Sequence, residues 1–122
     1  MKEQVVCISN GATRVLARDF DKDGDVDFGL ISSFPDYEKA PELDFVYLEN
    51  ENSEKFDFSS KVLEKPNEGR WLLMDAGDID LDGDEDIFLS SFIYSLAPVP
   101  ENLSKQWGNK NVDVLILENK LN

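Results

Sequence analysis

The chain contains no histidine, and this absence removes both the commonest general base and the commonest transition-metal ligand. Zinc and haem chemistry are therefore not expected. The single Cys7 lies in a short apolar run, where we expect a buried and unreactive thiol. With one cysteine, the chain cannot form an internal disulfide.

Long apolar runs and basic residues are also scarce. No stretch approaches the roughly 20 apolar residues of a membrane span, and the first apolar run is too short for a signal peptide. There are 12 basic residues against 26 acidic ones, which gives a net charge of −14. This balance repels phosphate backbones and anionic membranes, so we do not expect nucleic acid as a partner. A membrane span is not expected either, because no apolar run is long enough.

What the chain has in excess is acid, and the acid is unevenly placed. Its 122 residues are the common size of one domain. Eleven of the acidic residues, ten of them aspartates, fall in two short clusters, at 19–27 and 78–86. A charge run is usually a solvated face, but clustering of this kind predicts fixed counter-cations.

The two clusters belong to an internal repeat. The segment DFDKDGDVD at 19–27 returns as DIDLDGDED at 78–86, starting 59 residues later, and each copy continues into an apolar stretch that ends in Ser-Ser-Phe. A second pair follows, because LDFVYLEN at 43–50 resembles VDVLILEN at 112–119. The repeat unit therefore holds several secondary-structure elements.

Short apolar runs rich in β-branched and aromatic residues, bounded by Gly, Pro, Asn and Asp, predict an all-β fold. No convincing amphipathic helix is found. Residues 96–111 are expected to be a long loop with room for one helical turn at 103–107. The eight expected strands span residues 4–9, 14–20, 27–34, 43–49, 56–63, 70–76, 86–94 and 112–118.

The expected strands follow a four-strand pattern, with one antiparallel sheet per repeat. On this pattern residues 1–13 hold the last strand of a preceding sheet, 14–65 form a complete sheet with the first acidic loop, and 66–122 form a sheet with the second loop that lacks its fourth strand. Unpaired sheet edges invite association. Closure, oligomer formation and a larger parent protein all remain open.

The spacing of the aspartates predicts a calcium site in each loop. Calcium takes about six to eight oxygen ligands at roughly 2.3–2.6 Å. We expect positions 1, 3, 5 and 9 to give side-chain oxygens, position 7 to give a backbone carbonyl, and the glycine at position 6 to allow the turn. The expected ligands are Asp19, Asp21, Asp23, Asp25 and Asp27 around Gly24, and Asp78, Asp80, Asp82, Asp84 and Asp86 around Gly83. Two calcium ions per chain are expected, with water completing each shell and loose loops without metal.

Three other interpretations of these loops fit the sequence less well. Acidic turns without metal are the plainest, since Asp and Gly also favour tight hairpins. Magnesium prefers fewer protein ligands and keeps more of its water. An EF-hand loop needs a glutamate at position 12, where this chain has Leu30 and Leu89 in apolar segments.

Several sequence segments resemble those of a known family. They lie at residues 10–12 (NGA), 17–21 (ARDFD), 33–37 (SFPDY), 46–50 (VYLEN) and 69–78 (GRWLLMDAGD). The chain resembles FG-GAP or VCBS repeats, the calcium-binding blades of integrin-α-type β-propellers, and in particular the C-terminal blades of exported bacterial VCBS-repeat proteins. The resemblance implies β-propeller blades and an extracellular, cell-surface or periplasmic setting. Such propellers have about seven blades, whereas this chain has material for two, which implies a fragment or an assembly of copies.

We therefore expect a calcium-binding structural module with a protein or glycan partner, and no enzyme activity. One rival is a carbohydrate-active enzyme, and the other is a terminal cap that binds calcium alone. For the enzyme, the loop acids to test are Asp36, Glu38, Glu42 and Glu101. Phe28, Phe45, Trp71, Ile87 and Phe88 are expected in the core, and Tyr37, Tyr94 and Trp107 are weak candidates for a partner surface, with loop packing favoured.

Overall fold

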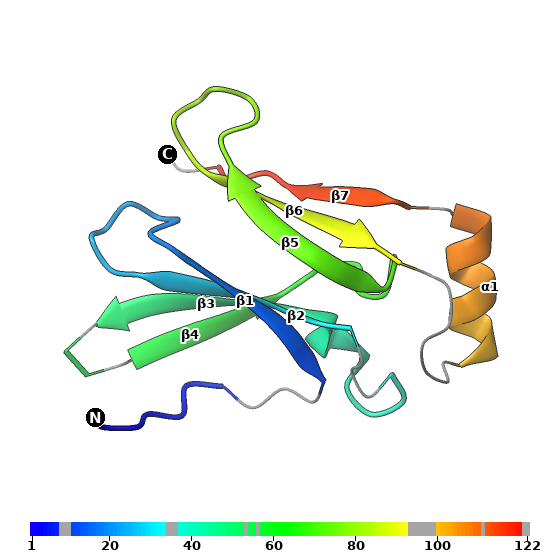
Figure 1. Cartoon of the computed structure of the whole chain (residues 1–122), viewed down its shortest axis with the longest axis horizontal. Helices are drawn as coiled ribbons and strands as arrows, with labels where there is room; N and C mark the ends of the chain where they lie inside the picture. The colour runs from blue at the N-terminus through cyan, green and yellow to red at the C-terminus, as the bar shows by residue number, and fades with distance from the viewer. Residues whose placement is uncertain are drawn as a thin grey trace.

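The structure is a computed structural model, and it describes residues 1–7, 11–33, 37–52, 54–55, 57–92, 100–110 and 112–120. Two antiparallel sheets face each other, and one helix lies beside the second sheet (Figure 1). The loops that join the first two strands of each sheet lie on the same side of the molecule, away from that helix. The prediction of an all-β fold is confirmed.

The first sheet has four strands in the order of the chain, β1-β2-β3-β4. These four strands correspond to those expected between residues 14 and 63, and a 3-10 turn, Pro41–Asp44, leads into β3. Polar turns separate the strands, so each neighbour in sequence is also the neighbour in the sheet. The strands are β1 Ala12–Arg18, β2 Asp27–Ser32, β3 Phe45–Asn52 and β4 Asp57–Val62.

The second sheet has three strands in the order β5-β6-β7. They are β5 Trp71–Gly77, β6 Asp86–Ser91 and β7 Val114–Leu117. The prediction of a strand at 4–9 is wrong for residues 4–7, which lie in neither sheet, while 8 and 9 lie outside the described residues. A strand needs a hydrogen-bonding edge, and the sheet to which this segment was assigned was expected to precede the chain.

The repeat extends to the register of the strands. In the first hairpin Ala12 pairs with Ser32, and the register then shifts by one residue. In the second hairpin Trp71 pairs with Ser91, and the same shift follows. An irregularity of this kind bends a strand and increases its twist, so the two hairpins share their local curvature as well as their pairing.

The segment predicted as a long loop contains a helix, α1, at Glu101–Lys110. That prediction was wrong, because a single turn was allowed where the helix has ten residues. Pro100 precedes the first turn, and Leu103 and Trp107, one turn apart, are both buried. The Trp107 indole nitrogen donates to the Asn67 carbonyl at 2.8 Å, so this ring packs inside the fold and offers no partner surface.

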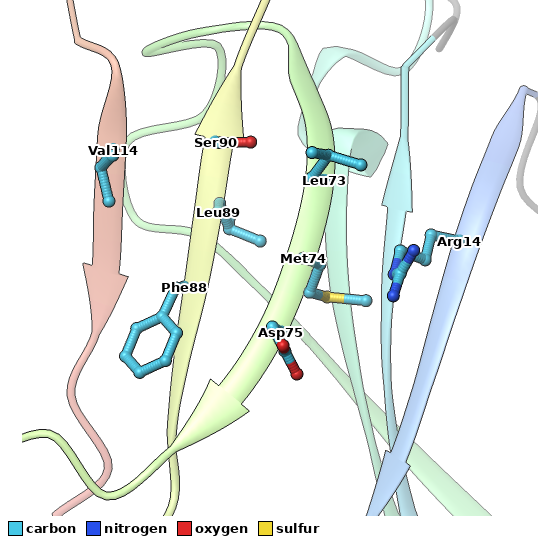
Figure 2. Close-up of a pocket in the computed structure, with 8 residues that line it drawn as sticks. All are labelled: Arg14, Leu73, Met74, Asp75, Phe88, Leu89, Ser90 and Val114. Carbon is cyan, nitrogen blue, oxygen red and sulfur yellow. The ribbon is translucent and has the colours of Figure 1, made fainter.

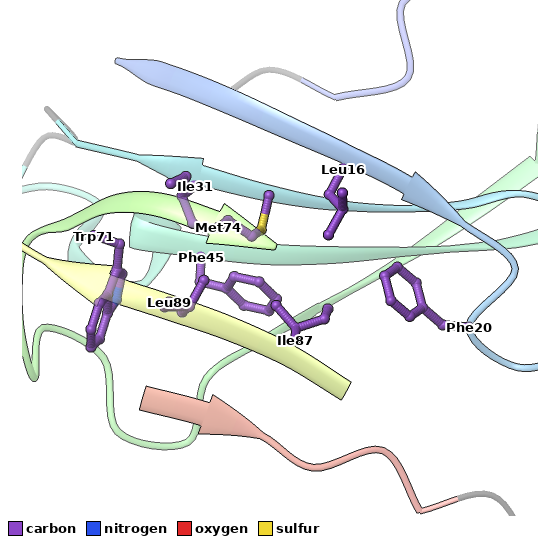
Figure 3. Packing of buried hydrophobic residues seen from close by; sticks show 8 residues of the cluster. All are labelled: Leu16, Phe20, Ile31, Phe45, Trp71, Met74, Ile87 and Leu89. Carbon is purple, nitrogen blue, oxygen red and sulfur yellow. The ribbon is translucent and has the colours of Figure 1, made fainter. Parts of the chain in front are cut away.

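The core lies between the two sheets (Figure 3). Phe45, Trp71 and Ile87 belong to it, as predicted. Phe28 and Phe88 do not, since both are only half-buried. Successive residues of a strand point to opposite faces, so Phe88 turns away from the first sheet because Ile87 faces it. The buried cluster comprises Leu16, Phe20, Ile31, Phe45, Trp71, Met74, Ile87 and Leu89.

Gly29 on β2 is a point of close approach between the sheets. A Cβ atom placed there would lie 3.5 Å from both the Ile87 Cδ1 and the Met74 Sδ atoms. Those are ordinary contact distances for one carbon atom, but they leave no room for a longer side chain. The absence of a side chain at this position lets the second sheet pack directly on the first.

A buried carboxylate, Asp44, joins three segments of the chain. It accepts hydrogen bonds from the backbone nitrogens of Phe45 at 2.9 Å and Asn67 at 2.8 Å, and from the Trp71 indole at 3.1 Å. Its side chain is 2% exposed, and burial raises the pKa of this carboxyl to about 6. Asp44 thus ties the first sheet to the linker and to the start of the second sheet.

Candidate metal centre

The two acidic loops have the same backbone conformation. The fourth position of each, Lys22 and Leu81, has a positive φ of 59° and 60°. The sixth position of each, Gly24 and Gly83, has a φ of 93° and 94°. Glycine adopts such angles without the steric cost that other residues incur, which explains its place in both copies.

The first aspartate of each loop caps its own turn. Asp19 accepts from the backbone nitrogens of the residues four and five positions later, at 3.2 and 2.9 Å. Asp78 does the same at 3.1 and 2.8 Å. These bonds hold one carboxylate at the open side of each loop, with lone pairs left for a further partner.

The ninth position of the first loop, Asp27, is fully buried at the start of β2. One of its carboxylate oxygens accepts from the Phe20 nitrogen at 3.0 Å, and the other accepts from the Asn50 nitrogen at 2.9 Å. Both the loop and the end of β3 therefore orient this carboxylate.

Asp86 occupies the ninth position of the second loop and is also fully buried. It accepts from the Ile79 nitrogen at 3.0 Å and from the Asn119 nitrogen at 2.8 Å. This arrangement matches that of Asp27 bond for bond. A buried carboxylate needs such donors, because an ionised group without them is costly to remove from water.

In each loop the carboxylates at positions 1, 3 and 9 come together. Each of the three offers one oxygen, and the three oxygens lie within 4.8 Å of one another. Two calcium–oxygen bonds of roughly 2.3–2.6 Å span about the same separation, so each cluster fits a single calcium ion. The clusters are Asp19, Asp21 and Asp27 in the first loop, and Asp78, Asp80 and Asp86 in the second.

The remaining expected ligands are placed differently. Asp23 and Asp82, at position 5, are not part of the two close clusters; instead each accepts from the backbone nitrogen two residues later, at 2.8 and 2.9 Å. Asp25 and Asp84 were expected to give backbone carbonyls, and that role stays a prediction. The side chain of Asp84 is engaged elsewhere, in an ion pair with Lys22 at 2.9 Å.

The electrostatics of the first cluster favour a bound cation. Burial, together with a side-chain hydrogen bond to Asp23 and charge repulsion from Asp27 and Asp23, raises the pKa of Asp21 to about 7. Crowded carboxylates of this kind retain protons unless a cation neutralises them. The cluster therefore has the oxygen-rich chemistry that a hard divalent ion prefers.

Two residues of the site were missed by the sequence interpretation. Asn50 and Asn119 hold the buried aspartates through their backbone nitrogens, although neither was proposed to act there. The signal was present, because both close the repeated Leu-Glu-Asn segment. That repetition marks the end of the third strand of each sheet, which returns to the acidic loop.

The acids proposed for an enzyme show no comparable arrangement among the described residues. Asp36 lies outside them, and Glu38, Glu42 and Glu101 are all exposed. Glu38 borders a hollow of about 530 Å³ that is lined by neither Glu42 nor Glu101. Tyr37, at the same hollow, packs edge-on against the Trp107 ring at 5.7 Å, as favoured, and Tyr94 lies outside the described residues.

Another groove, of about 350 Å³, runs beside β5 (Figure 2). Arg14 reaches toward it from β1, and Asp75 and Ser90 are its other polar side chains. None of the acidic-loop residues lines it. The groove is therefore separate from the two candidate metal sites.

Comparison of the chain with protein-family models, with curated proteins and with solved structures finds no match. Among the described residues, no helix has the length and apolar character needed to cross a membrane. The function is therefore inferred from the geometry of the two loops.

Proposed function

We propose that this chain is a calcium-binding structural module that holds one ion in each acidic loop and is not an enzyme. The observation that carries the proposal is the repetition of one geometry. Asp27 and Asp86 are both fully buried, and each lies with two other carboxylates whose oxygens come within 4.8 Å of one another. Acidic hairpin turns without metal would not require the same three-carboxylate arrangement twice.

Calcium fits these loops better than its competitors. Three clustered carboxylates, a further aspartate at position 5 and a carbonyl at position 7 provide the many oxygen ligands that calcium accepts. Magnesium would keep more of its water and use fewer of these groups. When bound, the ion would neutralise the clustered carboxylates, and its contribution would be to rigidity.

Binding should stabilise the fold, because the unfolded chain lacks the assembled site. A ligand present at 100 times its dissociation constant adds about 2.7 kcal/mol to the free energy of unfolding for each site. Extracellular calcium modules bind with dissociation constants of roughly 10⁻⁴–10⁻³ M, which suits the proposed extracellular or cell-surface setting.

We propose further that the two sheets are FG-GAP or VCBS-type propeller blades. The support is that, among the described residues, the packing between the two sheets is not continued on their outer faces. Met74, which faces the first sheet, is 2% exposed, while its counterpart Val15 is 60% exposed on the outer face. Open faces of this kind would take further blades or a second copy, and the loops would then present a protein or glycan surface.

Calorimetric titration of calcium into EDTA-stripped protein tests the metal proposal. Two ions should bind each chain, and thermal melts should shift upward with calcium. Asp21→Ala and Asp80→Ala, at the third position of each loop, should each leave one ion per chain, and the double variant should bind none. Glu54→Gln, an exposed acid outside the loops, serves as the control.

Absence of binding at millimolar calcium would refute the proposal and leave two acidic turns. Binding that persists in the double variant would place the ions elsewhere. Light scattering with and without calcium measures whether copies associate, and a monomer in both conditions would refute self-association of this chain.

A further inference from the structure

Asn119, two residues beyond the end of β7, links the two acidic loops. Its side-chain nitrogen donates to the Phe20 carbonyl at 2.7 Å and to the Glu85 carbonyl at 3.1 Å. Phe20 belongs to the first loop and Glu85 to the second. One amide group therefore bridges backbone positions that are far apart in the sequence.

This bridge completes a chain of hydrogen bonds between the two buried ligands. Asp27 accepts from the Phe20 nitrogen, the Phe20 carbonyl accepts from the Asn119 side chain, and the Asn119 backbone nitrogen donates to Asp86. The three distances are 3.0, 2.7 and 2.8 Å. Phe20 and Asn119 each orient one of the two buried aspartates, and the hydrogen bond between them links the two sites.

Ion pairs form a second contact between the loops. The Lys22 ammonium group lies 2.9 Å from the Asp84 carboxylate, and Arg18 lies 3.7 Å from Glu85. Both basic side chains belong to the first repeat and both acids to the second loop. Exposed ion pairs stabilise weakly, so charge adds a small contribution to the hydrogen bonds that hold the two loops together.

Asn50 is the counterpart of Asn119 and provides a contrast. Its backbone nitrogen also donates to the buried aspartate of its own loop. Its side-chain oxygen, however, accepts from the Asn52 nitrogen at 3.2 Å, within the same strand. Each asparagine therefore holds the buried carboxylate of its own loop, and Asn119 also bridges the two loops.

We propose that Asn119 is a positioning residue that couples the two sites, so that an ion in either loop raises the affinity of the other. This inference rests on the proposed calcium function. Ordering the shared residues costs conformational entropy once, and the second ion then binds a site that is already ordered. Repulsion between the two ions opposes this effect, but the loops are exposed and salt screens it.

The overall constant for binding two ions, divided by the product of the two single-site constants, measures the coupling. The single-site constants come from Asp80→Ala, which keeps the first site, and Asp21→Ala, which keeps the second. The ratio should be at least about five, the lower end of ordinary coupling between sites. It should fall to about one in the Asn119→Ala background and keep its value in the Asn50→Ala background.

Each outcome has a separate meaning. Absence of ion binding refutes the calcium function itself, whereas two independent sites, with a ratio of one or below, leave that function intact and overturn the coupling. A ratio that survives Asn119→Ala refutes the role of this residue. If Asn119→Ala does not fold by circular dichroism, Asn119→Ser replaces it, and the ratio of the parent chain still decides whether the loops are coupled.

Discussion

The two acidic loops have the same backbone conformation but different surroundings. Phe20 in the first loop is 4% exposed, while Ile79 at the same position of the second loop is 52% exposed. Lys22 pairs with the second loop, whereas its counterpart Leu81 is 87% exposed. Local sequence thus decides the shape of a loop, and the adjacent sheet decides what the loop buries.

The same contrast extends across the sheets. Phe45, which pairs with Ile31 on β2, is 4% exposed, and Val114, which pairs with Ser90 at the matching place on β6, is 62% exposed. The second sheet covers the first sheet at Phe45, whereas the equivalent place on the second sheet, at Val114, is open to solvent. Matched substitutions in the two halves should therefore have unequal costs.

The largest expected difference is at the second position of the loops. Phe20→Ala should lower the free energy of unfolding by about 3–5 kcal/mol, because it leaves a cavity in the core. Ile79→Ala should change it by less than about 0.5 kcal/mol, since an exposed side chain loses little burial. Urea denaturation in calcium-free buffer measures both, and equal losses would mean that Ile79 is covered in solution.

The next effect concerns the pH dependence of stability. Asp44 is buried with a pKa of about 6, above the value near 4 of an unfolded aspartate, whereas its counterpart Asp113 is exposed. A raised folded-state pKa gives stability that is complete below about pH 4 and is lost as the pH rises to about 6. The two-unit difference corresponds to about 3 kcal/mol.

Denaturation of calcium-free protein across this pH window tests the contribution. Asp44→Asn should remove that part of the pH dependence, while Asp113→Asn should keep it. A parent chain and an Asp44→Asn variant with parallel stability profiles between about pH 4 and 6 would show that Asp44 does not titrate there.

The smallest expected difference is between the two buried aspartates, Asp27 and Asp86. Asp27→Asn and Asp86→Asn should each cost about 1–3 kcal/mol in calcium-free buffer, because an amide can satisfy only one of the two backbone donors. Both carboxylates are fully buried and each accepts two bonds, so the two costs should agree within about 1 kcal/mol. If urea denaturation gives a larger difference between the two costs, the two aspartates contribute unequally to the stability of the fold.

Local features were predictable from the sequence to a large extent. Alternating aspartates with one glycine specified both hairpin turns, and short β-branched runs specified the strands of both sheets. The three clustered carboxylates of each loop were all among the predicted ligands. These features depend on residues close together in the chain, where backbone preference and spacing decide the outcome.

Features that depend on distant contacts were not predictable in the same way. The helix at Glu101–Lys110 is stabilised by burial of Leu103 and Trp107, which the sequence marks only by their four-residue spacing. The Asn119 side chain donates a hydrogen bond to the Phe20 carbonyl, 99 positions away in the sequence, and no local pattern around either residue predicts this contact. Residues 4–7 likewise form no strand, because a strand there would need the edge of another sheet to pair with.

Gly29 has a consequence for geometry beyond this one contact. Because Gly29 has no side chain, two successive sheets approach closely there, and Met74 and Ile87 pack next to this position. The spacing and tilt of neighbouring units determine the curvature of any array built by repeating them, and curvature determines how many units return to the starting point. In the proposed propeller, a single hydrogen atom in place of a side chain would thus help to set how many blades close the ring.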